Sequence, residues 1–274
     1  LQQLARGNNM TIGYVKECQL HPDSDHLKVC QVEVRPGEVK QIVCGAPNVA
    51  VGQKVIVANP GCDLGDGFVI KESKIRGQES NGMICSIAEL GLDQRLLKPE
   101  DKEGIHVLDS DAPVGEDPLA YIGLKDTILE IGLTPNRADC MAITSLAYEV
   151  AAILNRDVNL PEIKAIGNKD SDIQVKVETD LCPFFGAKLV KGVTTKESPA
   201  WLQNALIASG IKPINNIVDI SNFVMLETGQ PIHMYDYDKL TKKQFVVKTG
   251  FDCKEVMLDG EEYKIEPNDI IVST

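Results

Sequence analysis

The chain has 274 residues, more than one domain usually contains, so its length favours two compact units or one large one. With 43% hydrophobic and 25% charged residues, the composition excludes a disordered or collagen-like chain. The net charge of -12, from 28 basic and 40 acidic residues, disfavours a protein that binds nucleic acid mainly through a diffuse basic surface.

The sequence contains no signal for a membrane or for secretion. No apolar run approaches the roughly 20 residues that span a bilayer, so we predict no transmembrane segment and no membrane partner. The chain opens at Leu1 with no initiator Met, so we expect an excised piece, and no basic start followed by an apolar stretch predicts a secretory signal. Eight scattered cysteines are typical of reduced, packed thiols, so we expect a cytoplasmic location.

The first predicted domain covers residues 1–123. Short β-branched runs separated by glycine and proline occur at 10–15, 27–34, 41–44, 54–58, 68–70 and 104–108. This spacing suits a small closed β-barrel or a sandwich, and a five-stranded oligonucleotide-binding barrel is one candidate. The apolar residues change face between Val29 and Cys30, which predicts a bulge or a barrel corner there.

The second predicted segment, residues 124–170, is a helical connector. Leu146, Val150 and Leu154 recur at helical spacing, and Asp139 is the expected N-cap of this helix. A polar stretch at 161–172 predicts the boundary to the third segment.

The third predicted segment, residues 171–274, mixes strands with one helix. Strands are expected at 173–177, 245–248 and 270–272, with a hairpin turn at 258–261. Ser198 and Pro199 predict the cap and first turn of a short helix that stops at Gly210.

Two patterns resemble binding motifs but favour simpler interpretations. Cys18, His21, His26 and Cys30 could in principle supply four zinc ligands, yet their spacing matches no common zinc module and suits a polar turn between strands. We therefore predict no metal site. The glycine-rich run 61–67 lacks the lysine and the strand-to-helix context of a phosphate loop, so we predict a hairpin loop.

Lys71, Lys74 and Arg76 form the one modest basic cluster of the sequence. A solvated strand edge is one interpretation of this cluster, and a contact with RNA is the alternative.

His233 is the titratable group with the most suggestive surroundings. Ser221 and Asn222 precede it, Asp219 lies just before them, and further carboxylates follow. A histidine near a hydroxyl and carboxylates could position or activate water, and a structural histidine in a loop is the alternative.

Five motifs together carry a family resemblance. The segments 21–30, 41–49 and 75–86 resemble the tRNA-binding oligonucleotide-binding-fold domain of synthetase-associated proteins. The segments 134–140 and 218–233 resemble the bacterial phenylalanyl-tRNA synthetase beta chain. The resemblance runs over nearly the whole chain, and it implies a multidomain fold: an all-β oligonucleotide-binding barrel, a helical connector and a truncated α+β domain.

The resemblance also implies an editing site. Residues 171–274 would begin the B3/B4 domain, which hydrolyses tyrosine wrongly attached to phenylalanine tRNA, because a pocket for phenylalanine cannot strongly reject an added hydroxyl. Ser221 and Asn222 match substrate-binding positions, with serine where the family commonly has threonine. His233 matches the candidate catalytic position, where it would orient the ester and a water molecule without a metal. Further pocket residues of the family would follow Thr274.

The implied partners are phenylalanine tRNA and an alpha chain, in a heterotetramer of two alpha and two beta chains. ATP and Mg²⁺ would serve the parent ligase, and no cofactor is expected in this chain, which by itself should bind little tRNA and edit poorly. The alternatives are a non-catalytic tRNA-binding module, a hydrolase that edits in trans, and a structural spacer.

Overall fold

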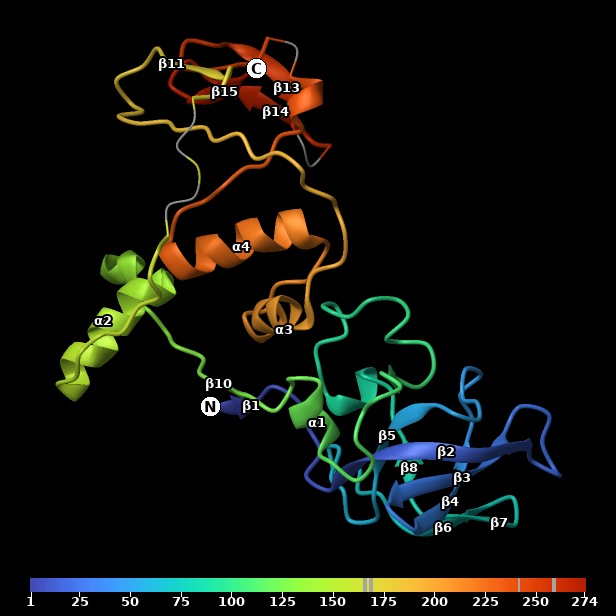
Figure 1. Cartoon of the computed structure of the whole chain (residues 1–274). Coiled ribbons are helices and arrows are strands. Elements are labelled where there is room, and N and C mark those ends of the chain that lie inside the picture. The colour runs from blue at the N-terminus through green and yellow to red at the C-terminus, as the bar shows by residue number, and fades with distance from the viewer. Residues whose placement is uncertain (165–166, 168–169, 241, 258–259) are drawn as a thin grey trace. The chain divides into compact units, whose positions relative to one another are not determined.

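The computed structural model describes residues 1–274 except 165–166, 168–169, 241 and 258–259 (Figure 1). The chain divides into two compact units. Unit 1 contains Leu1–Leu146 and Lys196–Gln230, and unit 2 contains Ala147–Thr195 and Pro231–Thr274. Within the described ranges, no helix combines the length and the apolar character needed to cross a membrane.

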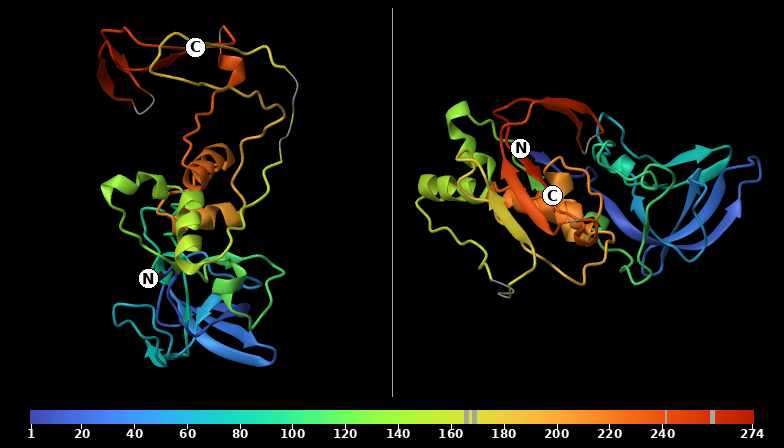
Figure 2. Two further views of the ribbon diagram at one scale, coloured as in Figure 1. Left: turned by 90° about the vertical axis from the view of Figure 1, so that its left-hand side faces the viewer. Right: turned by 90° about the horizontal axis from the view of Figure 1, so that it is seen from above.

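Unit 1 contains an antiparallel sheet and several short strands. The strands are β1 (Gln2–Gln3), β2 (Met10–Leu20), β3 (Lys28–Arg35), β4 (Glu38–Cys44), β5 (Lys54–Ala58), β6 (Ser73–Ile75), β7 (Gln78–Ser80), β8 (Met83–Ile84), β9 (Val107–Leu108) and β10 (Thr127–Ile128). The main sheet has the order β4-β3-β2-β5-β8, and β9 also pairs with β5. Two-stranded pairs form between β6 and β7 and between β1 and β10. The blue strands of this sheet curve strongly in the right-hand view of Figure 2.

Strand β5 forms as predicted because it is an unbroken apolar run buried on both faces. Ile56 and Ala58 pack into one hydrophobic cluster, and Val55 and Val57 pack into a second. Hydrogen bonds to β2 on one side and to β8 and β9 on the other satisfy its backbone. Burial of both faces of one strand lets two clusters share the same sheet.

The bulge predicted between Val29 and Cys30 is wrong. Strand β3 alternates regularly, with Cys30 and Val32 buried and Val29 half-buried on the opposite face. The ladder shifts register instead between Val15 and Glu17 of β2, and near the end of β3. Val29 is an apolar residue on the outer face of the sheet, and the strand alternates regularly past it without a bulge.

The sheet bends until β4 comes close to the chain between β7 and β8. The amide of Asn81 donates to the carbonyl of Gln41 at 2.8 Å, and the Val43 amide donates to the buried Ser80 hydroxyl at 3.1 Å. No strand pair joins β4 to β8 in the part of the chain that the structure describes. The region is therefore a curved sheet whose two ends meet through side-chain hydrogen bonds of Gln41 and Ser80 and through one backbone bond.

The predicted hairpin at 61–67 is confirmed. The Leu64 amide donates to the carbonyl of Phe68 at 3.0 Å, and Asp63 forms a bridge with Val69. Gly65 and Gly67 adopt φ angles of 93° and 79°, which glycine reaches without steric cost. In place of the strand expected at 68–70 the structure has only this bridge, and in place of the strand expected at 104–108 it has the short strand β9.

Helices α1 (Pro118–Tyr121) and α2 (Ile143–Leu154) follow the sheet, with short 3-10 turns η1 (Ala88–Leu90) and η2 (Pro135–Met141). Asp117 caps α1 by accepting from the amides of Leu119 and Ala120. The connector helix is present as α2, but the predicted cap at Asp139 is wrong. Asp139 lies inside η2, whose last turn is closed by the Ala142 amide, so α2 begins only at Ile143.

Helices α3 (Ala200–Ala208) and α4 (Asn216–Thr228) pack side by side in unit 1 (Figure 1). The predicted helix is confirmed as α3, but Ser198 does not cap it: its buried hydroxyl donates to the Asp219 carboxylate at 2.5 Å. The sequence analysis did not predict α4, which Asn215 caps by accepting from two amides.

Contacts of α3 with the preceding chain place both helices in unit 1. The Asn204 side chain donates to the Ile122 carbonyl at 2.8 Å, Lys98 pairs with Glu197, and Ile207 packs against the apolar cluster of Ile56. The compact units therefore divide the chain at other points than 123/124 and 170/171. Those domain boundaries stay a prediction.

Besides the part of α2 from Ala147 onward, unit 2 contains the strands β11 (Gln174–Val177), β12 (Gln244–Lys248), β13 (Cys253–Val256), β14 (Glu262–Ile265) and β15 (Ile271–Ser273), with the 3-10 turn η3 (Tyr237–Lys239). Strand β12 pairs in parallel with β11 and antiparallel with β15. Buried Phe245 of β12 contacts the rings of Tyr235 and Phe185. Strands β13 and β14 form a hairpin, but residues 258–259 of the predicted turn lie outside the described residues, as do four residues of the polar stretch 161–172.

Truncation of the fully buried Ile56 should destabilise unit 1. Ile56→Ala leaves a cavity between packed strands, so the free energy of unfolding should fall by about 2–5 kcal/mol. Urea denaturation followed by circular dichroism measures the change. Val39→Ala, on an exposed position of β4, should stay within about 0.5 kcal/mol. Equal losses in both variants would show that β5 is not the core strand.

Removal of the Asp219 carboxylate should destabilise the α3–α4 pair. Asp219 is fully buried and accepts from the Ser198 hydroxyl and, at 2.8 Å, from the Ile214 amide. Asp219→Ala leaves both donors unsatisfied, which should cost about 1–3 kcal/mol in the same denaturation experiment. The exposed Asp109→Ala is the matched control. An unchanged unfolding midpoint for Asp219→Ala would contradict this assignment.

Candidate functional site

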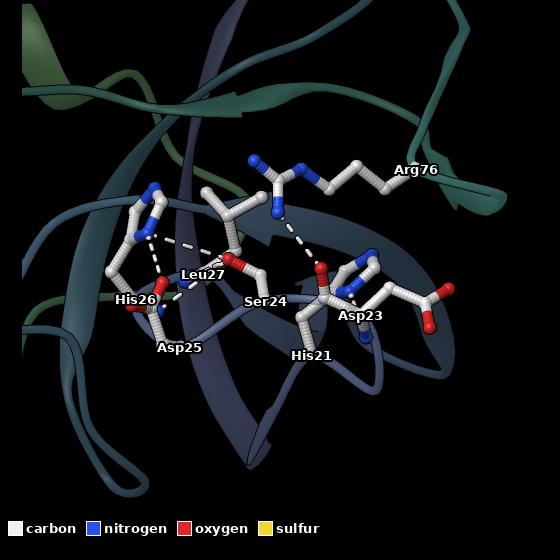
Figure 3. Close-up of polar contacts among 7 residues, drawn as sticks. All are labelled: His21, Asp23, Ser24, Asp25, His26, Leu27 and Arg76. Atoms are coloured by element: carbon white, nitrogen blue, oxygen red, sulfur yellow. Dashed lines mark hydrogen bonds and ion pairs between the residues drawn. The ribbon is translucent and has the colours of Figure 1, made fainter.

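The turn between β2 and β3, residues 21–27, is a compact polar loop (Figure 3). The His21 amide donates to the Leu27 carbonyl at 2.9 Å and closes the base of the loop. The Ser24 hydroxyl accepts from the Leu27 amide at 3.2 Å, and the Ser24 amide donates to the His21 carbonyl. Local hydrogen bonds therefore give this loop a defined shape.

His21 connects the loop to the β6–β7 hairpin. Its ring is buried, and Nδ1 accepts from the Asp23 amide at 3.0 Å. Because Nδ1 is an acceptor, Nε2 carries the proton and donates to the Ile75 carbonyl at 3.1 Å. Arg76, at the tip of the hairpin, donates from Nη1 to the Asp23 carbonyl at 2.8 Å. The loop and the hairpin thus form one surface, called here the loop–hairpin surface (residues 21–27 and 73–80).

The exposed rim of this surface carries charge of both signs. The Asp25 carboxylate lies 2.8 Å from Nδ1 of His26. That hydrogen bond, together with the charges of His26 and Arg76, lowers the pKa of the Asp25 carboxyl, which therefore stays ionised. A ligand that meets the rim therefore faces the Asp25 carboxylate and the Arg76 guanidinium.

The four candidate zinc ligands have other partners. The sulfurs of Cys18 and Cys30 lie 3.6 Å apart, both nitrogens of His21 are hydrogen bonded to the backbone, and His26 faces Asp25. The prediction that no metal binds here stays a prediction.

The three predicted basic residues have different surroundings. Arg76 holds the loop, and Lys74 lies 3.8 Å from the Glu79 carboxylate across the β6–β7 hairpin. Lys71 lines a groove of about 670 Å³ next to the end of β4. Lys102 and Glu89 are the other charged residues that line it. Lys74 and Arg76 belong to the loop–hairpin surface, while Lys71 belongs to the groove.

Ser221 and Asn222, predicted to bind substrate, lie on α4 in unit 1. The Ser221 hydroxyl donates to the Val218 carbonyl at 2.7 Å, which leaves its oxygen able to accept a further hydrogen bond. Both side chains are half-buried. Asp219, two residues before Ser221, fixes α4 through its bonds to Ser198 and Ile214, so it is structural.

His233 lies in unit 2 and is exposed. Its ring makes an edge contact with Tyr235 at a centroid distance of 4.7 Å. Desolvation raises the pKa of the Tyr235 hydroxyl, so that group stays protonated at neutral pH. Asp236 caps η3 and thus has a structural role. The structure brings Ser221 and Asn222 together on one helix and describes His233 within the other unit.

The sequence analysis did not recognise the structural roles of two residues, His21 and Asn215. The sequence analysis placed His21 in a polar turn, but it did not predict that this histidine links the loop to Ile75, which is 54 positions away. Asn215 before an apolar run is a local N-cap signal that would have predicted α4. No local signal marks the buried bond between Ser198 and Asp219.

Comparisons with known proteins identify two domains. Residues 10–117 match the family model of a tRNA binding domain, and residues 181–274 match that of the B3/4 domain. Among solved structures, a MetRS-related protein from Pyrococcus horikoshii aligns at 22% identity over 39% of this chain and 84% of that protein, with a TM-score of 0.28.

Curated relatives match the chain from end to end. The phenylalanine–tRNA ligase beta subunit of Geobacillus kaustophilus is 46% identical over 100% of this chain, and that of Bacillus subtilis is 46% identical over 96%. The chain spans 35% and 34% of the length of these two subunits. With both domains in one chain and this identity, the chain belongs to the family of phenylalanine–tRNA ligase beta subunits.

Proposed function

We propose that this chain acts as part of a phenylalanine–tRNA ligase beta chain. In that role it binds phenylalanine tRNA and contributes to hydrolytic editing of misattached tyrosine. The observation that carries the proposal is the presence of a tRNA binding domain at 10–117 and a B3/4 domain at 181–274 in one chain. An accessory tRNA-binding module or a spacer would not require the second domain.

The proposed fold of residues 1–123 is an oligonucleotide-binding barrel, followed by a connector at 124–170 and the editing domain at 171–274. The order β4-β3-β2-β5-β8 and the curvature of the sheet support the barrel. The bonds of Gln41 with Asn81 and of Val43 with Ser80 supply the contact expected where such a sheet closes on itself.

The loop–hairpin surface is the proposed site of tRNA contact. A chain with a net charge of -12 attracts phosphates poorly as a whole, so affinity must come from a few placed groups. Arg76 and Lys74 project from a hairpin that His21 fixes to the loop. Lys71 would extend this contact into the adjoining groove.

The editing reaction is proposed to be hydrolysis of the ester between tyrosine and the tRNA. Water adds to the ester carbonyl, the bond to the ribose oxygen breaks, and tyrosine and tRNA are released. Ser221 and Asn222 would hydrogen bond the substrate from α4, and the exposed His233 would orient the water and carry its proton.

The proposed partners are phenylalanine tRNA and an alpha chain, in an assembly of two alpha and two beta chains. ATP and Mg²⁺ would serve aminoacylation in the complete ligase. We assign no residue of this chain to them, because the glycine-rich run 61–67 folds as a hairpin and does not present helix amides to a phosphate. Without its partners the chain is expected to bind tRNA weakly and to edit slowly.

Loss of the Arg76 guanidinium should weaken tRNA binding. Arg76→Ala removes one potential phosphate contact and frees the loop, so the affinity of the 274-residue chain for phenylalanine tRNA should fall several-fold at low salt. The slope of log affinity against log salt should become shallower by about 1. Filter binding across a salt series measures both quantities.

Lys254→Ala is the charge-matched control, since Lys254 pairs with Glu262 on β14 of unit 2. An equal loss in both variants would indicate a diffuse charge effect. No binding by the unaltered chain at low salt would favour the spacer function.

Loss of the His233 imidazole should impair editing in the assembled ligase. His233→Ala should slow deacylation of tyrosyl-tRNA(Phe) by about 100-fold, the lower end of the usual effect of a general acid–base group. Release of radiolabelled tyrosine measures the rate, and the exposed neighbour Met234→Ala is the control. Editing at the unaltered rate in the His233→Ala ligase would remove His233 from the mechanism.

A further inference from the structure

Two thiols face each other at the base of the loop–hairpin surface. Cys18 of β2 and Cys30 of β3 are direct partners in the antiparallel ladder, and their sulfurs lie 3.6 Å apart. Neither Cys18 nor Cys30 is part of a disulfide. This geometry brings two reactive groups together at a point where neither the tRNA contact nor the editing reaction uses them.

The backbone pattern places this pair in the position that suits a disulfide. The His21 amide donates to the Leu27 carbonyl, so that pair is hydrogen bonded. Hydrogen-bonded and non-hydrogen-bonded pairs alternate along an antiparallel ladder. The register is unbroken from Leu20↔Lys28 to Cys18↔Cys30, three steps from the loop, which makes the cysteines a non-hydrogen-bonded pair.

Residues in such pairs have Cα atoms about 4.5 Å apart, within the range of about 4.4–6.8 Å that disulfides span. Rotation of the two side chains can therefore bring the sulfurs to bonding distance without separating the strands.

The two thiols differ in access. Cys18 is half-buried, while Cys30 is completely buried, and desolvation raises the pKa of the Cys30 thiol. Cys18 lies 3.8 Å from the Val49 carbonyl, which also accepts from the Lys28 ammonium at 2.8 Å. An oxidant from solvent thus meets Cys18 first, beside a positive charge, and Cys30 lies behind it as the second thiol.

Cys44 is the nearest rival partner, and the register argues against it. In the β3–β4 ladder Cys30 faces Ile42, whereas Cys44 faces Lys28. Cys30 and Cys44 are therefore diagonal neighbours, whose separation is typically about 7–8 Å. Cys18 is the better placed partner for Cys30.

We propose that Cys18 and Cys30 form a redox modification site, in which a peroxide oxidises the pair to an intramolecular disulfide. The Cys18 thiol reacts with hydrogen peroxide to give a sulfenic acid and one water. The Cys30 sulfur then attacks the Cys18 sulfur, the sulfur–sulfur bond forms and the sulfur–oxygen bond breaks. The leaving hydroxide takes up the proton of the Cys30 thiol and departs as a second water. Two thiols are oxidised and one peroxide is reduced to two waters. The bond links the two strands at the base of loop 21–27.

The test is a peptide map of the folded 274-residue chain after treatment with hydrogen peroxide. Free thiols are blocked with an alkylating agent before non-reducing digestion and mass spectrometry. We expect a cross-linked peptide that joins Cys18 to Cys30, with a mass two hydrogen atoms below the sum of the reduced peptides. Dithiothreitol should abolish it. Cys18→Ser should reduce its yield to background, and Cys253→Ser should leave it unchanged, because Cys253 is a half-buried thiol on β13 of unit 2.

Three results would overturn the proposal. They are sulfinic or sulfonic acid on Cys18 while Cys30 stays alkylatable, a cross-link of Cys18 or Cys30 to another cysteine, and oxidation of Cys253 while Cys18 stays reduced. The map of the unaltered chain decides between these outcomes even if Cys18→Ser does not fold.

Discussion

Burial of both faces of strand β5 is the constraint on which the architecture of unit 1 depends. Ile56 and Val57 point into different apolar clusters, and the strand pairs with β2, β8 and β9. The first half of β2 pairs with β5, and its second half pairs with β3 and leads into the 21–27 loop. The position of the loop therefore follows from core packing far from the loop itself.

The loop obtains its shape from a few buried polar contacts. His21 is bonded at both nitrogens, to the loop and to the hairpin, and Ser80 satisfies the Val43 amide where β4 approaches the chain after β7. Buried groups of this kind are costly when unpaired, so they specify one arrangement. The proposed tRNA contact relies on this fixed geometry, because a chain with a net charge of -12 has no strong overall attraction for phosphates.

Sequence reasoning succeeded where the signal is local. The run 54–58 is apolar throughout, and β5 has those bounds; Gly65 and Gly67 marked a hairpin that the structure contains. It failed where a residue far away in the sequence determines the partner of a side chain. The Ser198 hydroxyl bonds Asp219 and not the start of α3. Helix α4 was missed for a different reason: its many β-branched residues are typical of strands, and the local N-cap signal of Asn215 was overlooked. For the site, sequence similarity indicated Ser221, Asn222 and His233, but residue spacing alone cannot relate α4 to a loop of another unit.

The most direct test of the account is hydrogen–deuterium exchange of the 274-residue chain at low salt, with and without excess phenylalanine tRNA. If the loop–hairpin surface binds tRNA, amides of residues 21–27 and 73–80 should exchange more slowly in its presence, while those of the β13–β14 hairpin should not change. Protection confined to unit 2, or bound tRNA without protection of loop 21–27, would contradict the account.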